Sequence, residues 1–166
     1  MRRTVPPSAE IQASIDKLLA KGMVDDPQTM LSELARLGAR LIIQRAVEEE
    51  FDTWLGRARY ERRPERQRGL KNYDSGMRNG FRPRRLQTAE GELRIEIPQA
   101  RETAQPFVSK LFPKWHCKRL FRTDPLKALV IGGFVRGLSM RDIESLCEEA
   151  GLGKLSRSTV ARICAE

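Results

Sequence analysis

Residues 139–162 read SMRDIESLCEEAGLGKLSRSTVAR and contain two predicted helices joined by a turn with two glycines. Ser139 and Asp142 have the spacing of a capping box, with Asp in place of the usual Glu, and this pattern predicts the start of the first helix. Ser156 is the predicted N-cap of the second helix, which continues at least to Ala165. Short helices separated by a glycine turn are typical of a helix-turn-helix unit.

A third predicted helix precedes these two, starts at Asp124 and ends at Gly137, so that residues 123–166 form one three-helix unit. Its apolar period and that of the next two helices predict a core that contains Leu126, Leu129, Val130, Phe134, Val135, Ile143, Leu146, Cys147, Val160 and Ile163. In helix-turn-helix units the first residues of the last helix contact base edges in the major groove. We therefore expect DNA contacts from Arg157, Ser158, Thr159 and Arg162. The alternative is a bundle whose last helix serves packing alone.

Nearly all of the net positive charge of the chain lies in residues 56–85, GRARYERRPERQRGLKNYDSGMRNGFRPRR. The segment has eleven Lys or Arg against three acidic residues, a net +8 of the +9 for the whole chain. Few aliphatic side chains accompany them, which predicts a flexible arm that binds DNA phosphates. The residues expected to contact DNA are Arg78, Asn79, Arg82, Arg84 and Arg85. A solvated basic linker is the alternative.

Aromatic residues are interleaved with these arginines at Tyr60, Tyr73 and Phe81. Such rings either stack on bases or anchor the arm to a neighbouring helix, and the sequence leaves both roles open.

The N-terminal region, residues 1–55, is predicted to be helical. One amphipathic helix starts near Ser8 and ends at Gly22, and a long one runs from an N-cap at Asp26 to Gly56. The second exceeds the average helix length, so it packs on the first helix or on a partner subunit, and a homodimer through it is a hypothesis. Glu48, Glu49 and Glu50 (residues 48–50) point in different directions on a helix and are interpreted as a solvated face.

Residues 86–98 have the pattern of a β-hairpin, because Leu93, Ile95 and Ile97 alternate with charged residues behind a short turn. Residues 99–122 follow as an irregular connector with two prolines. His116 and Cys117 lie in the connector, but their spacing from the other cysteines matches no zinc site. The predicted fold class is mainly α with a small β-hairpin.

Composition excludes several other classes of protein. The chain has 166 residues and is 40% apolar, and its longest apolar run, residues 128–135, is too short to span a bilayer. The N-terminus lacks the apolar stretch of a secretory signal, and three cysteines without a paired spacing indicate free thiols in a reducing compartment. We expect a cytoplasmic, nucleoid-associated protein whose partner is double-stranded DNA, without a small-molecule substrate.

The order of these pieces resembles the N-terminal part of bacterial Mutator-type insertion-sequence transposases over residues 30–166. The motifs that carry the resemblance are EEF (49–51), LGR (55–57), RYER (59–62), RNGFRPR (78–84), GELRIEIP (91–98), RE (101–102), RGLSMRDI (136–143) and SRSTV (156–160). The resemblance implies DNA transposition by a ribonuclease-H-like domain, whose Asp-Asp-Glu triad holds two Mg²⁺ ions.

No part of this sequence matches that catalytic domain, so we expect no cofactor, no metal site and no DNA cleavage by the chain alone. Because the sequence stops at Glu166, we expect a truncated gene or the first of two reading frames. The leading hypothesis is sequence-specific binding to the inverted-repeat ends of the mobile element. A stand-alone helix-turn-helix regulator and an RNA-binding protein are the alternatives.

Overall fold

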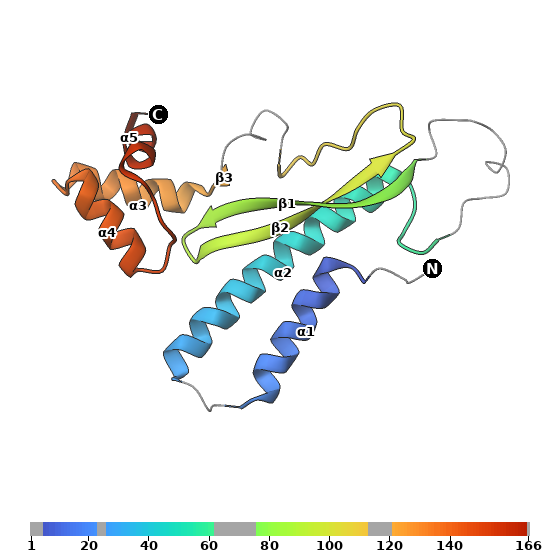
Figure 1. Ribbon diagram of the computed structural model, residues 1–166, viewed down its shortest axis with the longest axis horizontal. Helices are drawn as coiled ribbons and strands as arrows, with labels where there is room; N and C mark the ends of the chain where they lie inside the picture. Colours follow the sequence, from blue (N-terminus) through green and yellow to red (C-terminus); the bar gives the residue numbers. More distant parts are fainter. Residues whose placement is uncertain (1–4, 23–25, 62–75, 113–120, 166) are drawn as a thin grey trace.

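A computed structural model describes residues 5–22, 26–61, 76–112 and 121–165. A long N-terminal helix packs against a long β-hairpin, and a shorter helix packs against the long one. Three further helices gather at the tip of the hairpin (Figure 1). The predicted fold class, mainly α with a small hairpin, is confirmed. The elements are α1 (Pro7–Ala20), α2 (Pro27–Leu55), β1 (Met77–Thr88), β2 (Gly91–Arg101), β3 (Phe121–Arg122), α3 (Asp124–Val135), α4 (Met140–Glu149) and α5 (Arg157–Ala165).

The long helix α2 has the boundaries that its sequence predicts. The Asp26 carboxylate accepts a hydrogen bond from the Thr29 N–H at 3.2 Å, and Pro27 occupies the first turn. Gly56 ends the helix with φ at +70°, a left-handed conformation that favours glycine. Helix α1 packs against α2, so the long helix has a partner within the chain.

The hairpin is longer than expected. Strand β1 begins at Met77 rather than at residue 86, so the end of the predicted basic arm is part of a sheet. Arg82 and Arg84 of this strand sit opposite isoleucines of β2, whereas Arg85 sits opposite an arginine. Pro98 lies within β2 rather than after it, which is tolerated because β2 is an edge strand and a bulge interrupts the opposite strand just there.

The core has two parts, one beneath the hairpin and one in the C-terminal helices. The hairpin core contains Val47 of α2 together with Leu86, Leu93, Ile95 and Ile97. The C-terminal core contains Leu126, Val130, Ile143, Cys147, Leu152, Leu155, Val160 and Ile163. Four residues expected inside are exposed instead, because α3 and α4 each bury a narrower stripe than their composition suggests: Leu129, Phe134, Val135 and Leu146.

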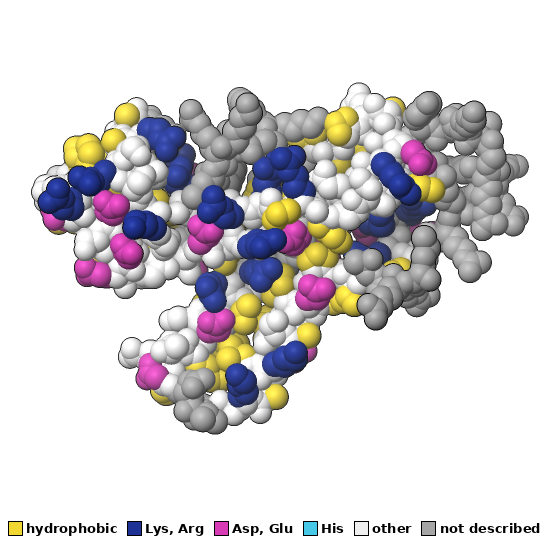
Figure 2. All heavy atoms as spheres, viewed as in Figure 1, with side chains coloured by type: hydrophobic (Ala, Val, Ile, Leu, Met, Phe, Trp, Pro, Cys, Tyr) yellow, Lys and Arg dark blue, Asp and Glu magenta, His cyan; other side chains and the backbone are white. Residues whose placement is uncertain are grey.

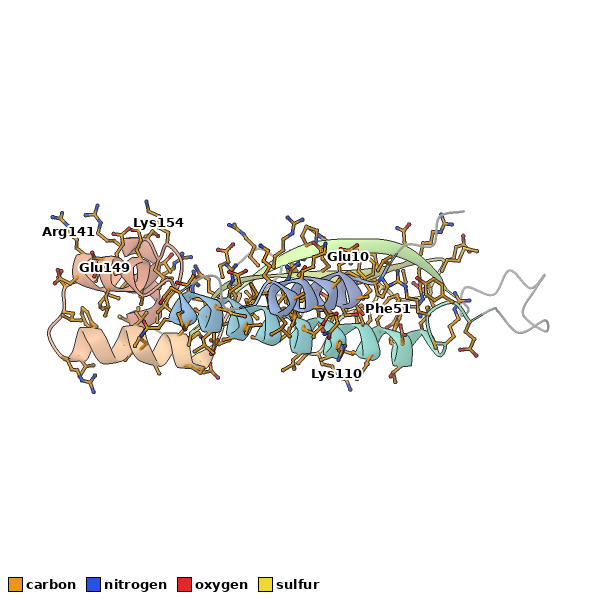
Figure 3. All side chains as sticks on the ribbon, turned by 90° about the horizontal axis from the view of Figure 1, so that it is seen from below. Glu10, Phe51, Lys110, Arg141, Glu149 and Lys154 are labelled. Carbon is orange, nitrogen blue, oxygen red and sulfur yellow. The ribbon has the colours of Figure 1, made fainter. Side chains whose placement is uncertain are left out.

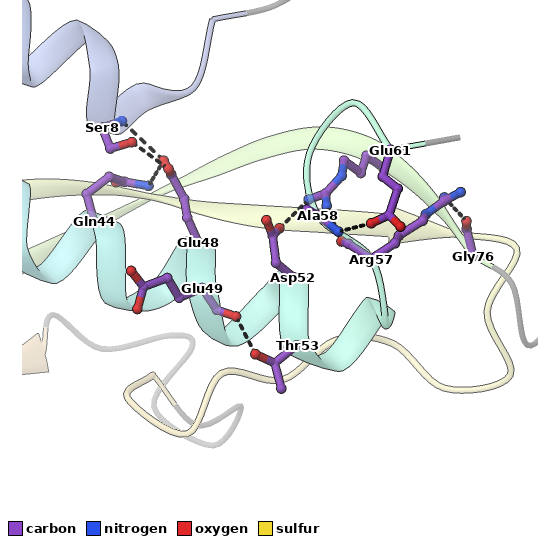
Figure 4. Close-up of polar contacts among 11 residues, drawn as sticks. Ser8, Gln44, Glu48, Glu49, Asp52, Thr53, Arg57, Ala58, Glu61 and Gly76 are labelled. Carbon is purple, nitrogen blue, oxygen red and sulfur yellow. Dashed lines mark hydrogen bonds and ion pairs between the residues drawn. The ribbon is translucent and has the colours of Figure 1, made fainter. Parts of the chain in front are cut away.

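Gln44 links three elements through its fully buried side chain (Figure 4). Its amide donates to the Glu96 carbonyl and accepts from the Glu96 N–H, both at 2.9 Å, as a neighbouring strand would. The second amide hydrogen goes to Glu48, at 3.0 Å. Glu48 in turn accepts hydrogen bonds from the backbone N–H and hydroxyl of Ser8 at the start of α1.

The prediction that residues 48–50 form a solvated face is therefore wrong for two of the three carboxylates. Glu48 is half-buried in the bonds just described. Glu50, also half-buried, accepts from the Ser109 hydroxyl and the Lys110 N–H of the segment that follows β2. The side chains of Glu48 and Glu50 point in different directions, as expected, and each accepts hydrogen bonds from a different neighbouring segment.

The hairpin tip meets the C-terminal helices through close backbone contacts. The Gln87 carbonyl accepts from the Thr123 N–H at 3.0 Å, just before α3, and the Gln87 side chain accepts from Arg122. A Cβ at Gly91 would lie 3.0 Å from the Gly151 carbonyl oxygen, so glycine permits this approach. Strand β3 adds to β1 in parallel within the expected connector, whose His116 and Cys117 lie outside the described residues.

Replacement of Gln44 by Leu should lower the free energy of unfolding by about 2 kcal/mol or more, because both backbone groups of Glu96 lose their partner. Urea unfolding of the full chain measures the change. Gln28→Leu is the matched control, since Gln28 is an exposed glutamine on the same helix. Equal stability of the two variants would contradict the role assigned to Gln44.

The capping box of α4 predicts a pH dependence of stability. Both of its bonds form, and the hydrogen bond from the Ser139 side chain, followed by that from its backbone, lowers the pKa of Asp142. A lowered pKa stabilises the fold above the unfolded value of about 4 and loses this effect as pH falls through the folded pKa.

Asp142→Asn should therefore be less stable than the natural chain near neutral pH, and the difference should shrink below about pH 4. Thermal unfolding between acidic and neutral pH measures it, with Asp124→Asn, an exposed first-turn aspartate of α3, as baseline. A difference that stays constant down to strong acid would count against the assignment.

Candidate nucleic-acid interface

Helix α5 is fixed by its apolar side and presents its polar side. The Ser156 carbonyl accepts from the Val160 N–H at 3.0 Å, which starts the helix where the sequence predicts. Leu155, Val160 and Ile163 are buried in the C-terminal core. This packing leaves the opposite side of the helix facing solvent.

Three of the four residues predicted on α5 lie on that solvent side. Arg157, Ser158 and Arg162 are exposed. The Arg157 guanidinium lies 3.6 Å from Glu144 with 62% of its side chain accessible, and Arg162 donates to the Ser158 carbonyl at 3.3 Å. These contacts are loose and surface-exposed, so both arginines can turn toward a ligand.

Thr159 differs from the other three, because only 7% of its surface is accessible. Its hydroxyl lies 3.1 Å from the Ser156 hydroxyl and accepts from Arg162 at 3.3 Å. The prediction that Thr159 contacts DNA therefore has no support from its exposure in this structure. Thr159 precedes the buried Val160, and its hydroxyl accepts a hydrogen bond from Arg162, which helps to hold that arginine in place.

The hairpin presents a second basic surface. Asn79, Arg82 and Arg85 are exposed, and Arg84 is half-buried. Arg85 lies opposite Arg94 across the two strands, with Glu92 3.8 Å from Arg85. Two arginines placed directly opposite each other repel, so an anion bound between them would relieve the repulsion.

Arg94 was not among the residues predicted to contact DNA, although the alternation of β2 places it outward. Its side chain is 65% accessible, and its guanidinium lies 3.0 Å from Glu96. The sequence already indicated this exposure, because Arg94 occupies a polar position in the alternation of polar and apolar residues over 93–97. We name Asn79, Arg82, Arg84, Arg85 and Arg94 the hairpin surface. The strand register places Arg85 and Arg94 on the face of the hairpin away from its core, and Arg82 and Arg84 on the face that carries the buried isoleucines.

Arg78 is not part of this surface, contrary to the prediction. Its guanidinium forms an ion pair with Asp52 at 2.7 Å and donates to the Arg57 carbonyl at 2.9 Å. It also lies over the Phe51 ring, 5.1 Å from the ring centroid. Arg78 thus fastens the start of β1 to the end of α2, and a phosphate would have to break these contacts.

Two further basic residues accompany these surfaces. Arg141 of α4 and Lys154 of the α4–α5 loop project toward the side of the molecule on which the hairpin lies, and α3 occupies the opposite side (Figure 3). Figure 2 shows Lys and Arg side chains over both the C-terminal helices and the hairpin on this face. Acidic side chains are interspersed, so the face is basic without being uniformly so.

Within residues 5–22, 26–61, 76–112 and 121–165, no group of three His, Cys, Asp or Glu side chains is placed to hold a metal ion. This part of the chain does not fit the two-metal triad that the family resemblance implies. Burial raises the pKa of the Cys147 thiol, which keeps it protonated and unreactive. No described helix is long and apolar enough to cross a membrane.

Comparison with known proteins places the chain among transposases. It is 28% identical to the transposases for insertion sequence element IS1081 of Mycobacterium tuberculosis and Mycobacterium bovis, over 87% of this chain and 33% of each relative. It is 32% identical to the transposase for ISRM5 of Rhizobium meliloti, over 75% of this chain and 28% of that protein. The chain thus spans about a third of the length of the curated relatives it matches.

The family model described as "Transposase, Mutator family" matches residues 11–166, which include both basic surfaces and all three C-terminal helices. The chain belongs to the Mutator family of transposases.

Proposed function

We propose that this chain supplies DNA recognition to a Mutator-type transposase, and that it binds the inverted-repeat ends of its mobile element. The observation that carries the proposal is the placement of Arg157 and Arg162 on the solvent side of α5, whose other side is anchored in a core. Arginine has the fork geometry that pairs with the guanine edge in the major groove. Because the other side of α5 is packed in the core, the helix holds these guanidinium groups in a fixed position relative to the groove.

The hairpin surface has a different role in this proposal. Its arginines are spaced along a two-stranded ribbon, and Arg82, Arg85 and Arg94 are exposed, which suits contacts to phosphates. Phosphate contacts position a protein on DNA, whereas base contacts select the sequence. The helix α5 would then select the site while the hairpin surface holds the duplex.

Three further features belong to the proposal. DNA binding by this chain needs no metal ion or other cofactor, so it should persist in EDTA. The protein acts in the cytoplasm at the nucleoid, where its DNA partner lies. Two chains act together as a homodimer, one for each of the two inverted ends, which matches the two-fold symmetry of most oligomers.

Replacement of Arg157 or Arg162 by Ala should weaken binding to the preferred site by about 1 to 3 kcal/mol and change binding to random duplex much less. The preferred site is first obtained by selection from random duplexes with the full chain. Arg136→Ala is the control, because Arg136 is an exposed arginine after α3. Failure of the selection to enrich any motif, or equal losses on both DNAs, would refute base reading by α5.

Replacement of both Arg82 and Arg85 by Ala should weaken binding to preferred and random duplexes alike. The slope of log K against log salt should become shallower by about 2, since each neutralised phosphate contributes roughly 0.9 to that slope. Fluorescence anisotropy over a salt series measures it. Arg36→Ala, an exposed arginine of α2 paired with Glu33, should leave the slope unchanged. A double variant with an unaltered slope would show that these arginines do not bind phosphates.

A further inference from the structure

A pocket of about 420 Å³ opens where the end of α2, the start of α1 and the open end of the hairpin meet. Its size lies in the range of sites for small organic groups. Among the residues that line it are Glu48, Asp52, Arg59, Tyr60, Arg78 and Phe81. It lies at the opposite end of the hairpin from the C-terminal helices.

Aromatic rings and guanidinium groups dominate the wall of this pocket. The Arg59 guanidinium lies 5.5 Å from the ring centroids of both Tyr60 and Phe81. The two carboxylates in the wall are already engaged, Asp52 by Arg78 and Glu48 by Ser8 and Gln44. A ligand therefore meets aromatic rings and guanidinium groups, beside carboxylates that already accept hydrogen bonds from Arg78, Ser8 and Gln44.

Tyr60 is held at the mouth of this pocket by an unusual backbone. Its φ is +68°, a left-handed conformation that bulky residues rarely adopt, and 54% of its surface is accessible. The turn is closed by a hydrogen bond from the Ala58 N–H to the Glu61 carboxylate at 2.9 Å (Figure 4). Backbone conformations of this kind persist where the surroundings enforce them, and they cluster at binding sites.

We infer that this pocket takes one unpaired nucleobase of a DNA strand. Aromatic faces combined with arginines are the means by which proteins bind unpaired bases, because every base has a face that stacks and a phosphate beside it. The inference rests on the proposed DNA-binding function, since the duplex must be held nearby.

The hairpin supplies the connection between duplex and pocket. Phe81 lines the pocket, and Arg85 of the hairpin surface lies on the same face of β1, four residues further along the strand. A strand whose phosphates lie along β1 would therefore reach the pocket with its adjacent base. A base that is already unpaired costs least to bring there, because no stacking or pairing has to be broken. The pocket thus favours DNA with an unpaired base next to the duplex.

The test uses the full chain and a duplex with a short single-stranded overhang that carries 2-aminopurine, a base whose emission falls when it stacks. Binding should quench the probe in the overhang. Tyr60→Ala and Phe81→Ala should abolish the quenching and weaken binding of the overhang duplex by about fivefold or more. Tyr60→Phe keeps the ring and should retain both effects.

Controls separate this site from the rest of the protein. Phe134→Ala removes an aromatic residue of comparable exposure on α3, 44% accessible, and should leave the quenching intact. Binding of the blunt duplex is measured with every variant. If the natural chain does not bind the blunt duplex, the proposed function is refuted. If it binds the blunt duplex but does not quench the probe in the overhang, only the assignment of the pocket is overturned.

Two more outcomes would overturn the inference. If Tyr60→Ala weakens blunt and overhang duplexes equally, the ring serves the duplex interface or the fold. If free deoxyadenosine monophosphate binds as tightly as the overhang duplex, the pocket serves mononucleotides rather than a DNA strand. Preference for the overhang duplex that depends on the two rings supports the pocket as assigned.

Discussion

The side chain of Gln44 supplies what the edge strand β2 lacks, a partner for its outer backbone groups. The amide meets the N–H and carbonyl of Glu96 as a third strand would, from a helix that also packs under the hairpin. Its remaining hydrogen binds Glu48, which holds the start of α1 through Ser8. One fully buried amide thus fixes the positions of β2, α2 and α1 relative to one another.

A hairpin anchored in this way can carry arginines on its exposed positions. Residues such as Arg82 and Arg85 contribute nothing to a core, and a free hairpin of this composition would be marginal in water. Here the apolar residues of β2 and the helix behind them provide the stability. The hairpin tip then docks at Gln87 and Gly91 against the C-terminal helices, which sets the hairpin surface and α5 in a defined geometry.

The candidate interface could be predicted from the sequence in outline but not in every residue. Arg157 and Arg162 are exposed as the helical period requires. The sequence does not distinguish Arg78 and Thr159 from the exposed residues, but Arg78 forms an ion pair with Asp52 and Thr159 is buried beside Arg162. The position of Arg78 depends on Asp52, which is distant in the chain, and the burial of Thr159 depends on which side of α5 faces the core.

The sequence by itself determined the helix boundaries, the apolar faces of the C-terminal helices and the outward positions on α5, because caps, glycines and periodicity act within a few residues. It could not show that the arginine-rich stretch from residue 77 is a strand. That stretch has little strand propensity of its own, and it is ordered by pairing with β2, whose outer edge is satisfied by Gln44. Such pairing is decided by tertiary contacts, since strand stability depends on neighbours more than on intrinsic preference.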